Sequence, residues 1–328
     1  MTLIVAFMVA FVVSVVLGKL LIPALRALKA GQSIKEIGPT WHMSKQGTPT
    51  MGGLMFIAGI AVAVVVAGWN QMMQGKYAHL LVFLFALVFG VIGFVDDYEK
   101  VKHHHNTGLT APQKFLLQLS ASVAFTVLLR YLGFLTPNLY IPFVGVELIL
   151  PWPGYMAFAA FVMVATVNAV NITDGVDGLA TGVTVPVALF YVAVAAWYGY
   201  TELGVFAAAL AGGLVAFLIY NFHPAKVFMG DTGSLFLGGA VCGMAFALNI
   251  PLIIPVIGII YVAEVLSDII QVTYFKLTHG KRIFRMAPLH HHLEMGGWSE
   301  VKLFCVFTLI TMLMCVLSFM GVMDRIGL

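Results

Sequence analysis

The stretch NAVNITDGVDG, residues 168–178, ends one of the long apolar runs of this chain and is the segment from which we interpret the rest. It contains two asparagines, two aspartates and two glycines. The mean hydropathy of the chain is +1.00, so most of the neighbouring sequence is expected to lie in lipid. Polar groups at a membrane boundary are costly to desolvate and usually line a cavity or a site. Gly175 and Gly178 predict that the helix breaks near Asp174.

Composition places the chain among the helical membrane proteins. Of its 328 residues, 61% are hydrophobic and only 9% are charged, whereas about a quarter of the residues of a soluble domain are charged. A membrane β-barrel would instead show alternating segments of about ten residues. We therefore expect an all-α, polytopic membrane protein that forms a single domain over residues 1–328, with no nucleic-acid partner.

Ten apolar runs are long enough to cross the hydrocarbon core, which takes about 20 helical residues. They predict transmembrane helices over residues 2–26, 50–68, 78–96, 114–133, 154–171, 179–198, 203–220, 233–249, 251–275 and 302–323. The first run lacks a basic n-region and an A-x-A cleavage site, so we expect it to be retained as a span.

The lysines and arginines predict the orientation of these spans. With the N-terminus outside, thirteen of them fall at inner loops and helix ends, and only three, Lys76, Arg130 and Arg325, fall at outer ones. Because these residues are enriched on the cytoplasmic side, both termini are expected to be extracytoplasmic. The outer connection also contains two β-prone segments, 139–142 and 146–149, which predict a short external β-hairpin.

Three polar loops then fall on the cytoplasmic side: FVDDYEK at 94–100, the 168–178 stretch, and NFHPAKVFMGDTGS at 221–234. The adjacent carboxylates of Asp96 and Asp97 repel each other and favour a cation, and hard carboxylate oxygens suit Mg²⁺. Each motif taken alone is also compatible with a solvated helix end or a helix N-cap. Together they predict that the loops meet at one membrane face and form a site for phosphate chemistry.

The 168–178 stretch offers amides and carboxylates at a regular spacing. Asn168, Asn171, Asp174 and Asp177 follow one another every three residues, so a continuing helix would keep them on one side. Such groups bind a ribose, a base edge or a metal-bound water, although an ordinary polar turn has the same composition. Asn221, at the end of another apolar run, adds a further polar group.

Two histidine triplets occur in loops predicted to be cytoplasmic. Adjacent helical residues point about 100° apart, so His290, His291 and His292 are not expected to ligate one metal. We expect them to donate hydrogen bonds to phosphate or to a sugar acid. The triplet at 103–105 precedes Asn-Thr-Gly and is interpreted as part of a solvated loop.

Three lysines, Lys45, Lys114 and Lys226, stand at predicted cytoplasmic helix ends, where interfacial snorkelling is the alternative explanation for each of them. Jointly they would offset the charge of a nucleotide diphosphate. Phe228 follows closely and is placed to stack on a base, or to act as an interfacial aromatic residue.

Five motifs together carry a resemblance to a known family. They are GTPTMGG at 47–53, VDDYEK at 95–100, NAVNITDGVDGLA at 168–180, NFHPAKVFMGDTGS at 221–234 and KRIFRMAPLHHHLE at 281–294. With them the chain resembles the bacterial phospho-N-acetylmuramoyl-pentapeptide transferases, which belong to the polyprenyl-phosphate N-acetylhexosamine-1-phosphate transferase superfamily. The aspartate motifs point to the superfamily and MAPLHHHLE to the muramoyl-pentapeptide branch.

The resemblance implies a ten-span homodimer in the bacterial cytoplasmic membrane that requires Mg²⁺. It implies transfer of phospho-N-acetylmuramoyl-pentapeptide from its UDP conjugate to undecaprenyl phosphate, giving lipid I and UMP in peptidoglycan synthesis. The family's essential aspartates match Asp96, Asp97 and Asp231, and its uridine pocket matches Lys45, Asp174, Gly175, Asp177 and Phe228. Its catalytic-face asparagines and histidines match Asn171, Asn221, His290, His291 and His292. The family's loop after the aspartate pair is usually rich in Lys, Asn and Arg, whereas this chain has histidines at 103–105.

The expected mechanism is electrostatic. Mg²⁺, held mainly by Asp231 together with Asp97, polarises the diphosphate. Asp97 or Asp96 positions or deprotonates the lipid phosphate, and lysines such as Lys114, together with the histidines, stabilise the phosphoryl oxygens. A covalent phospho-intermediate stays an alternative to direct transfer.

Two other functions stay open from the sequence. A sister transferase that uses UDP-N-acetylglucosamine would share the aspartate motifs. A transporter should place its polar residues near the bilayer midplane, and only Glu264 and Asp268 fit that picture. We interpret this pair, which shares one helical face, as a helix-packing or kink feature.

Overall fold

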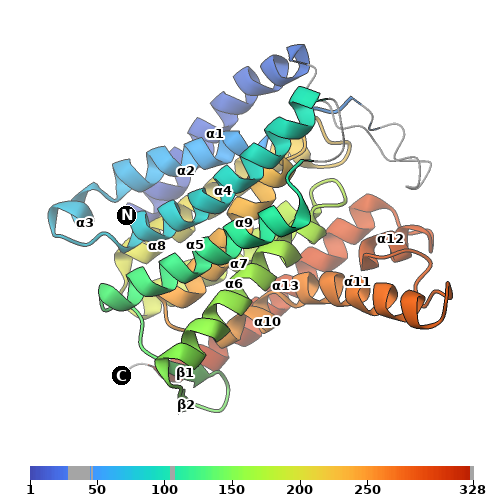
Figure 1. The fold of residues 1–328 in the computed structure, drawn as a ribbon. Helices are drawn as coiled ribbons and strands as arrows, with labels where there is room; N and C mark the ends of the chain where they lie inside the picture. The colour runs from blue at the N-terminus through green and yellow to red at the C-terminus, as the bar shows by residue number, and fades with distance from the viewer. Residues whose placement is uncertain (29–44, 46, 104–107, 326–328) are drawn as a thin grey trace.

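The computed structural model describes residues 1–28, 45, 47–103 and 108–325 and is a bundle of long helices (Figure 1). The long helices are α1 (Thr2–Ala27), α2 (Gly53–Ala67), α4 (Ala78–His103), α5 (Ala111–Tyr131), α6 (Trp152–Thr173), α7 (Leu179–Trp197), α8 (Thr201–Asn221), α9 (Gly230–Ala247), α11 (Ile259–Leu277) and α13 (Glu300–Val322). Shorter helices are α3 (Trp69–Met73), α10 (Ile254–Ile257) and α12 (Leu289–Glu294), with 3₁₀ turns at Pro251–Ile253 and Met323–Arg325.

The all-α prediction is confirmed, and each of the ten predicted spans contains a helix. In the described residues, seven helices are long and apolar enough to cross a membrane, or eight if one bent pair is a single span. The long helices outside that set are α2, which has only 15 residues, and α9, whose 18 residues include five glycines and a polar first turn.

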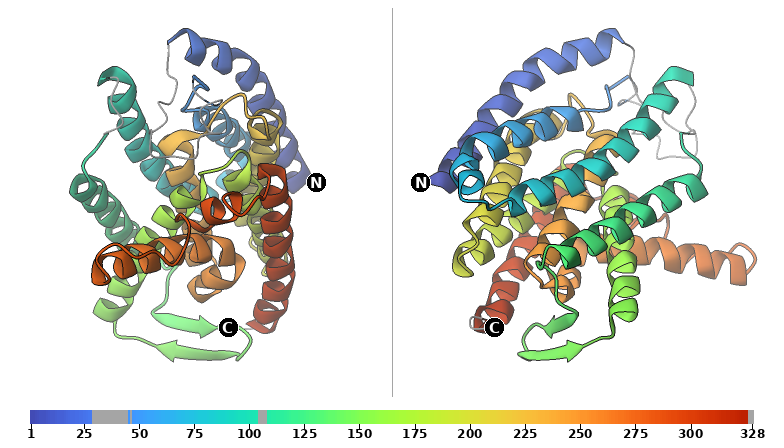
Figure 2. Two further views of the ribbon diagram at one scale, coloured as in Figure 1. Left: turned by 90° about the vertical axis from the view of Figure 1, so that its right-hand side faces the viewer. Right: turned by 60° about the vertical axis from the view of Figure 1, so that its left-hand side comes forward.

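The prediction of a continuous span over 251–275 is wrong. The chain bends by 80° between Pro251–Ile257 and Ile259–Leu277. The break falls at Gly258, which ends α10 with φ −101° and ψ 28°, outside the helical region, and glycine disfavours the interior of a helix. As a result the C-terminal end of α11 projects away from the bundle (Figure 2), whereas the helix packs against α6, α12 and α13.

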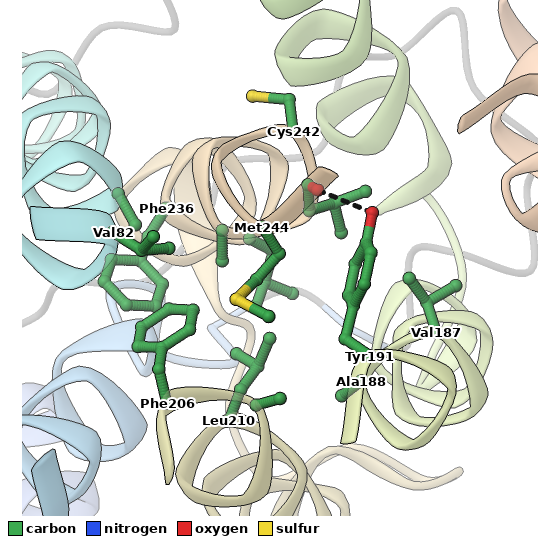
Figure 3. Packing of buried hydrophobic residues seen from close by; sticks show 14 of the residues in the cluster. Val82, Val187, Ala188, Tyr191, Phe206, Leu210, Phe236, Cys242 and Met244 are labelled. Carbon is green, nitrogen blue, oxygen red and sulfur yellow. Dashed lines mark hydrogen bonds between the residues drawn. The ribbon is translucent and has the colours of Figure 1, made fainter. Parts of the chain in front are cut away.

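Helix α9 is the central element of the bundle and packs against α4 and α6. Every residue of α9 from Thr232 to Ala247 is buried. Its glycines permit close approach, since a Cβ on Gly238 would lie 2.5 Å from the Cα of Val167 in α6. Figure 3 shows Phe236 and Met244 of this helix among side chains of neighbouring helices. There the Tyr191 hydroxyl of α7 donates to the carbonyl oxygen of Val241 at 2.8 Å. Helix α9 is therefore surrounded by protein, which explains why it needs little hydropathy of its own.

The predicted hairpin is confirmed. Strand β1 (Asn138–Ile141) pairs antiparallel with β2 (Val146–Ile149), with Asn138 opposite Ile149. The turn is fixed to the end of α13, because the Phe143 N–H donates to the carbonyl oxygen of Gly321 at 3.1 Å. The hairpin, the N-terminus and the C-terminal end of α13 lie toward one end of the bundle, whereas α12 and the C-terminal ends of α1 and α4 lie toward the other (Figures 1 and 2).

Candidate active site

A cluster of carboxylates forms where the C-terminal part of α4 meets the first turn of α9. Helix α4 supplies Asp96 and Asp97, and α9 supplies Asp231. The two helices touch because Gly93 has no side chain: a Cβ there would lie 2.0 Å from the Asp231 carbonyl oxygen. Local packing thus joins two motifs that are more than a hundred residues apart in the sequence.

Asp97 holds the start of α9. Its Oδ1 accepts from the Asp231 N–H at 3.1 Å, and its Oδ2 accepts from the Thr232 N–H at 2.9 Å and from the Thr232 hydroxyl at 2.7 Å. The unpaired N–H groups and the dipole of a helix N-terminus favour a carboxylate at this position. Asp97 is only 3% exposed, so its carboxylate fixes the backbone that carries Asp231.

Asp231 is held by three donors from three other helices. Lys100 of α4 and Lys114 of α5 donate to its Oδ2 at 2.9 and 2.7 Å, and the Asn171 amide of α6 donates to its Oδ1 at 2.8 Å. The same lysines lie 2.6 and 3.4 Å from Oδ2 of Asp96. The other Asp96 oxygen accepts from the N–H of Leu109 at 2.8 Å.

The charges of this cluster fit a divalent cation. One oxygen of each of the three aspartates lies within 4.8 Å of the others. Three carboxylates against two ammonium groups leave a formal charge of −1, which favours a further cation. Oxygen-only ligands suit Mg²⁺ better than zinc or copper.

A second polar cluster forms beside the turn between α6 and α7. Lys45 donates to Asp177 Oδ1 at 2.7 Å and to Glu300 Oε2 at 2.6 Å. The other Asp177 oxygen accepts from the N–H of Ala225 at 2.9 Å and lies 3.0 Å from Nδ1 of His223. Asp177, His223 and Glu300 also have a metal-ligating arrangement, but the Lys45 ammonium already supplies a cation between the two carboxylates.

Asp174 connects the two clusters electrostatically. The predicted helix break is confirmed, since α6 ends at Thr173 and Gly178 starts α7 with φ +74°. Burial, together with the negative charges of Asp231, Asp97 and Asp177, raises the pKa of Asp174 to about 8. Groups whose pKa is perturbed in this way concentrate at functional sites.

The three histidines of α12 have three different environments. The buried His290 ring has Nδ1 2.9 Å from Oε2 of Glu264 in α11. Its other nitrogen, Nε2, packs against the 174–178 turn, where a Cβ on Gly175 would lie 2.2 Å away. His291 lies 2.8 Å from Glu294, and His292 accepts from the N–H of Arg285 at 3.1 Å.

Several predicted site residues lie outside the carboxylate cluster. The Asn168 amide donates to Gln118 at 2.7 Å, and the Asn221 amide donates to the carbonyl oxygen of Val227 at 3.0 Å, so both join neighbouring segments. Phe228 is half-buried and connects two loops, because its N–H donates to the Pro49 carbonyl oxygen and its carbonyl oxygen accepts from Gly52. Lys226 is exposed.

The described histidine of the 103–105 triplet belongs to neither cluster and is the last residue of α4, so the predicted loop position is wrong for it. His103 is an exposed side chain beside Glu99. The other two histidines of that triplet lie outside the described residues.

Sequence reasoning missed three polar residues of these clusters, Lys100, His223 and Glu300. Lys100 stands four residues after Asp96, a helical spacing that indicates the ion pair. For Glu264, outside both clusters, the kink interpretation is wrong because the bend lies at 258, whereas the packing interpretation agrees with its contact to His290, which joins α11 to α12. Glu300 and His223 carried no local signal, because only the fold brings them to Asp177.

Comparisons with known proteins agree on one family. The Glycosyl transferase family 4 model matches residues 79–249, and a Phospho-N-acetylmuramoyl-pentapeptide-transferase signature matches residues 45–57. A phospho-N-acetylmuramoyl-pentapeptide-transferase of Clostridium acetobutylicum is 46% identical over 96% of this chain and 97% of its own length. The enzymes of the same name from Clostridium botulinum (strain Alaska E43) and Acetivibrio thermocellus are 48% and 46% identical, over 96% and 95% of this chain and 95% and 93% of their own lengths.

Proposed function

The chain belongs to the phospho-N-acetylmuramoyl-pentapeptide-transferase family, and we propose that its reaction takes place at the carboxylate cluster of Asp96, Asp97 and Asp231. The enzyme transfers phospho-N-acetylmuramoyl-pentapeptide from its UDP conjugate to undecaprenyl phosphate, which gives lipid I and UMP in peptidoglycan synthesis. The observation that carries the proposal is the position of Lys100 and Lys114, within 2.9 Å of Asp231 in a cluster that retains a negative formal charge.

The carboxylates have separate roles in this proposal. Asp231 and Asp96, with one oxygen of Asp97, would hold Mg²⁺, which when bound neutralises charge on the diphosphate. Asp97 keeps Asp231 in place through the first turn of α9. Asp96 lies beside both lysines and would orient the lipid phosphate or accept its proton as it attacks the β-phosphate of the donor.

The lysines would act on the transferred phosphate. Lys100 and Lys114 come from different helices and converge on one oxygen of Asp231. A diphosphate bound at the cluster would take over part of these contacts, and the ammonium groups would then stabilise its oxygens as UMP leaves. Fixed charges of this kind provide most of the catalysis in phosphoryl transfer.

The second cluster is proposed as the nucleotide pocket. Lys45, Asp174, Gly175, Asp177 and Phe228 would bind the uridine, since their segments surround the 174–178 turn next to the carboxylates. The histidines of α12 and the amides of Asn168, Asn171 and Asn221 would support the donor side, with His290 fixing the turn through Gly175. The protein would work as a homodimer with ten spans and with this site on the cytoplasmic face.

A donor-specific assay tests the proposal. Purified protein with undecaprenyl phosphate and Mg²⁺ should release UMP from UDP-N-acetylmuramoyl-pentapeptide. Release should fall to background with EDTA, and UDP-N-acetylglucosamine should not replace the donor. UMP release from UDP-N-acetylglucosamine would contradict the donor assignment, and full activity in EDTA would contradict the metal assignment.

A further inference from the structure

We propose that Glu300 is a positioning residue of the donor pocket, which holds the Lys45 ammonium and the backbone of Asp177 in the arrangement that binds the nucleotide. This inference rests on the proposed assignment of Lys45 and Asp177 to the uridine pocket. It adds a residue of α13, an element that none of the site motifs in the sequence includes.

One carboxylate oxygen makes the contacts on which the inference depends. Glu300 Oε2 accepts from Lys45 Nζ at 2.6 Å and from the Asp177 N–H at 3.0 Å. The same oxygen lies 3.7 Å from Nδ1 of His223. The partners lie 255 and 123 residues away in the sequence, so Glu300 joins three otherwise separate segments at one atom.

Among the residues that the structure describes, Asp177 is the other carboxylate at Lys45, and neither of its oxygens is free to replace Glu300. Asp177 Oδ1 already accepts from Lys45, and its Oδ2 is occupied by the N–H of Ala225 and by His223. Without the Glu300 carboxylate, Lys45 would keep one of its two anionic partners and the Asp177 N–H would lose its acceptor. Hydrogen bonds to charged groups are the stronger ones in proteins, so the turn would be held less firmly.

Charge explains why Glu300 acts through Lys45 rather than on the substrate. A carboxylate that faced a diphosphate would repel it. Here the ammonium of Lys45 is bound to both Glu300 and Asp177, and its side chain is only 13% exposed. The carboxylates restrict this cation to one position, and a cation held in place binds an anionic ligand at a lower entropic cost.

The start of α13 is itself well defined. Ser299 has an extended backbone and caps the helix, because its side chain accepts from the Lys302 N–H at 3.2 Å. Glu300 follows as the first helical residue, so its backbone is fixed by the helix and its side chain reaches Lys45 from a rigid base.

The Glu300→Gln variant tests the inference, because it keeps the shape of the side chain and removes its charge. We expect the KM for the UDP donor and the Kd for UMP to rise about tenfold or more. The kcat should change less than about threefold, and the KM for undecaprenyl phosphate should stay the same. The donor KM should rise further in Glu300→Ala than in Glu300→Gln, because the glutamine side chain can still accept a hydrogen bond from the Asp177 N–H.

Ser299→Ala is the matched control for general loosening of α13. It removes the helix cap and should lower the melting temperature, but it keeps the Glu300 carboxylate and should leave the donor KM at the wild-type value. An equal rise in donor KM in Ser299→Ala and Glu300→Gln would overturn the inference. It would show that Glu300 affects donor binding only through the stability of α13.

A double variant tests whether Glu300 acts through Lys45. In a Lys45→Met background, Glu300→Gln should raise the donor KM much less than in the wild-type background. A wild-type donor KM in Glu300→Gln, measured beside an active wild-type enzyme, would refute the inference alone. Failure of the wild-type protein to release UMP from the muramoyl donor would instead refute the proposed function.

Discussion

At the scale of single residues, the proposed site depends on how two lysines share one carboxylate. Lys100 and Lys114 both donate to Oδ2 of Asp231, and both also lie near Asp96. Lysines that only snorkelled to the interface would point their ammonium groups to water. These two are directed inward, which is the arrangement expected where anionic substrates bind.

Replacement of Lys100 by methionine should lower kcat about a hundredfold, the usual effect of the loss of one electrostatic contact to a transition state. UMP release by the detergent-purified variant would be the measurement. The matched control is Lys102→Met on the same helix, whose ammonium lies 6.0 Å from the centre of the Tyr98 ring rather than at the cluster. Equal effects of the two substitutions would show that Lys100 has no specific role.

Asp174 should make the stability of the metal-free protein depend on pH. Its pKa is about 8 in the folded state, well above the usual value of an unfolded aspartate, so the folded state binds the proton more tightly. Stability therefore falls as pH rises from about 4 to 8. Asp174→Asn should flatten the melting temperature measured in EDTA between pH 5 and 8, and an unchanged slope would contradict the raised pKa.

Single residues also set the limit of sequence reasoning. Asp96, Asp97, Asp231 and Lys114 could be found because each follows or precedes an apolar run. Lys100 was overlooked although its spacing from Asp96 is helical, and Glu300 could not be found, because only tertiary packing places it at Lys45.

At the scale of helices, the contact between α4 and α9 determines the geometry of the cluster. The two backbones meet where Gly93 of α4 faces the carbonyl group of Asp231 in α9. Any side chain there would push the first turn of α9 away from Asp97 and break the three hydrogen bonds that hold it.

Gly93→Ala should therefore reduce both activity and stability. Overpacking of this kind costs about 1–3 kcal/mol of folding free energy, and the displaced Asp231 should lower kcat. Thermal unfolding and UMP release would be measured on the same preparation. Gly154→Ala serves as the control, because its Cβ would lie 3.7 Å from the nearest atom, Cγ of Pro151. Wild-type activity in Gly93→Ala would contradict the role of this contact.

Hydropathy predicted where helices form more reliably than it predicted where a helix bends. The runs at 78–96 and 179–198 became α4 and α7, and the hairpin formed where β-prone segments flank a glycine. The bend at 258 could not be predicted from hydropathy, because the residues on both sides are apolar and only Gly258 marks the break.

At the scale of the whole molecule, the hairpin and the N-terminus lie toward one end of the bundle, and the C-terminal end of α4, the helix that supplies Asp96 and Asp97, lies toward the other (Figure 1). This separation agrees with the predicted orientation, in which thirteen lysines and arginines are inside and three are outside. Which end of the bundle faces the cytoplasm stays a prediction, based on this asymmetry in lysine and arginine.

Cysteine labelling in whole cells would test the orientation. In a variant without Cys242, Cys305 and Cys315, a membrane-impermeant maleimide should label Gln74→Cys in intact cells. It should label Lys281→Cys only after lysis. Both positions are exposed in the structure, and labelling of Lys281→Cys in intact cells would reverse the orientation.

The central claim is that three aspartates from two distant motifs form one centre for phosphoryl transfer. The most direct test is UMP release from UDP-N-acetylmuramoyl-pentapeptide by Asp231→Asn, compared with the wild-type protein at matched melting temperature and oligomeric state. We predict that turnover is abolished while the protein stays folded, because the variant removes the charge shared by Lys100, Lys114 and the proposed metal. Wild-type turnover in that variant would contradict the claim.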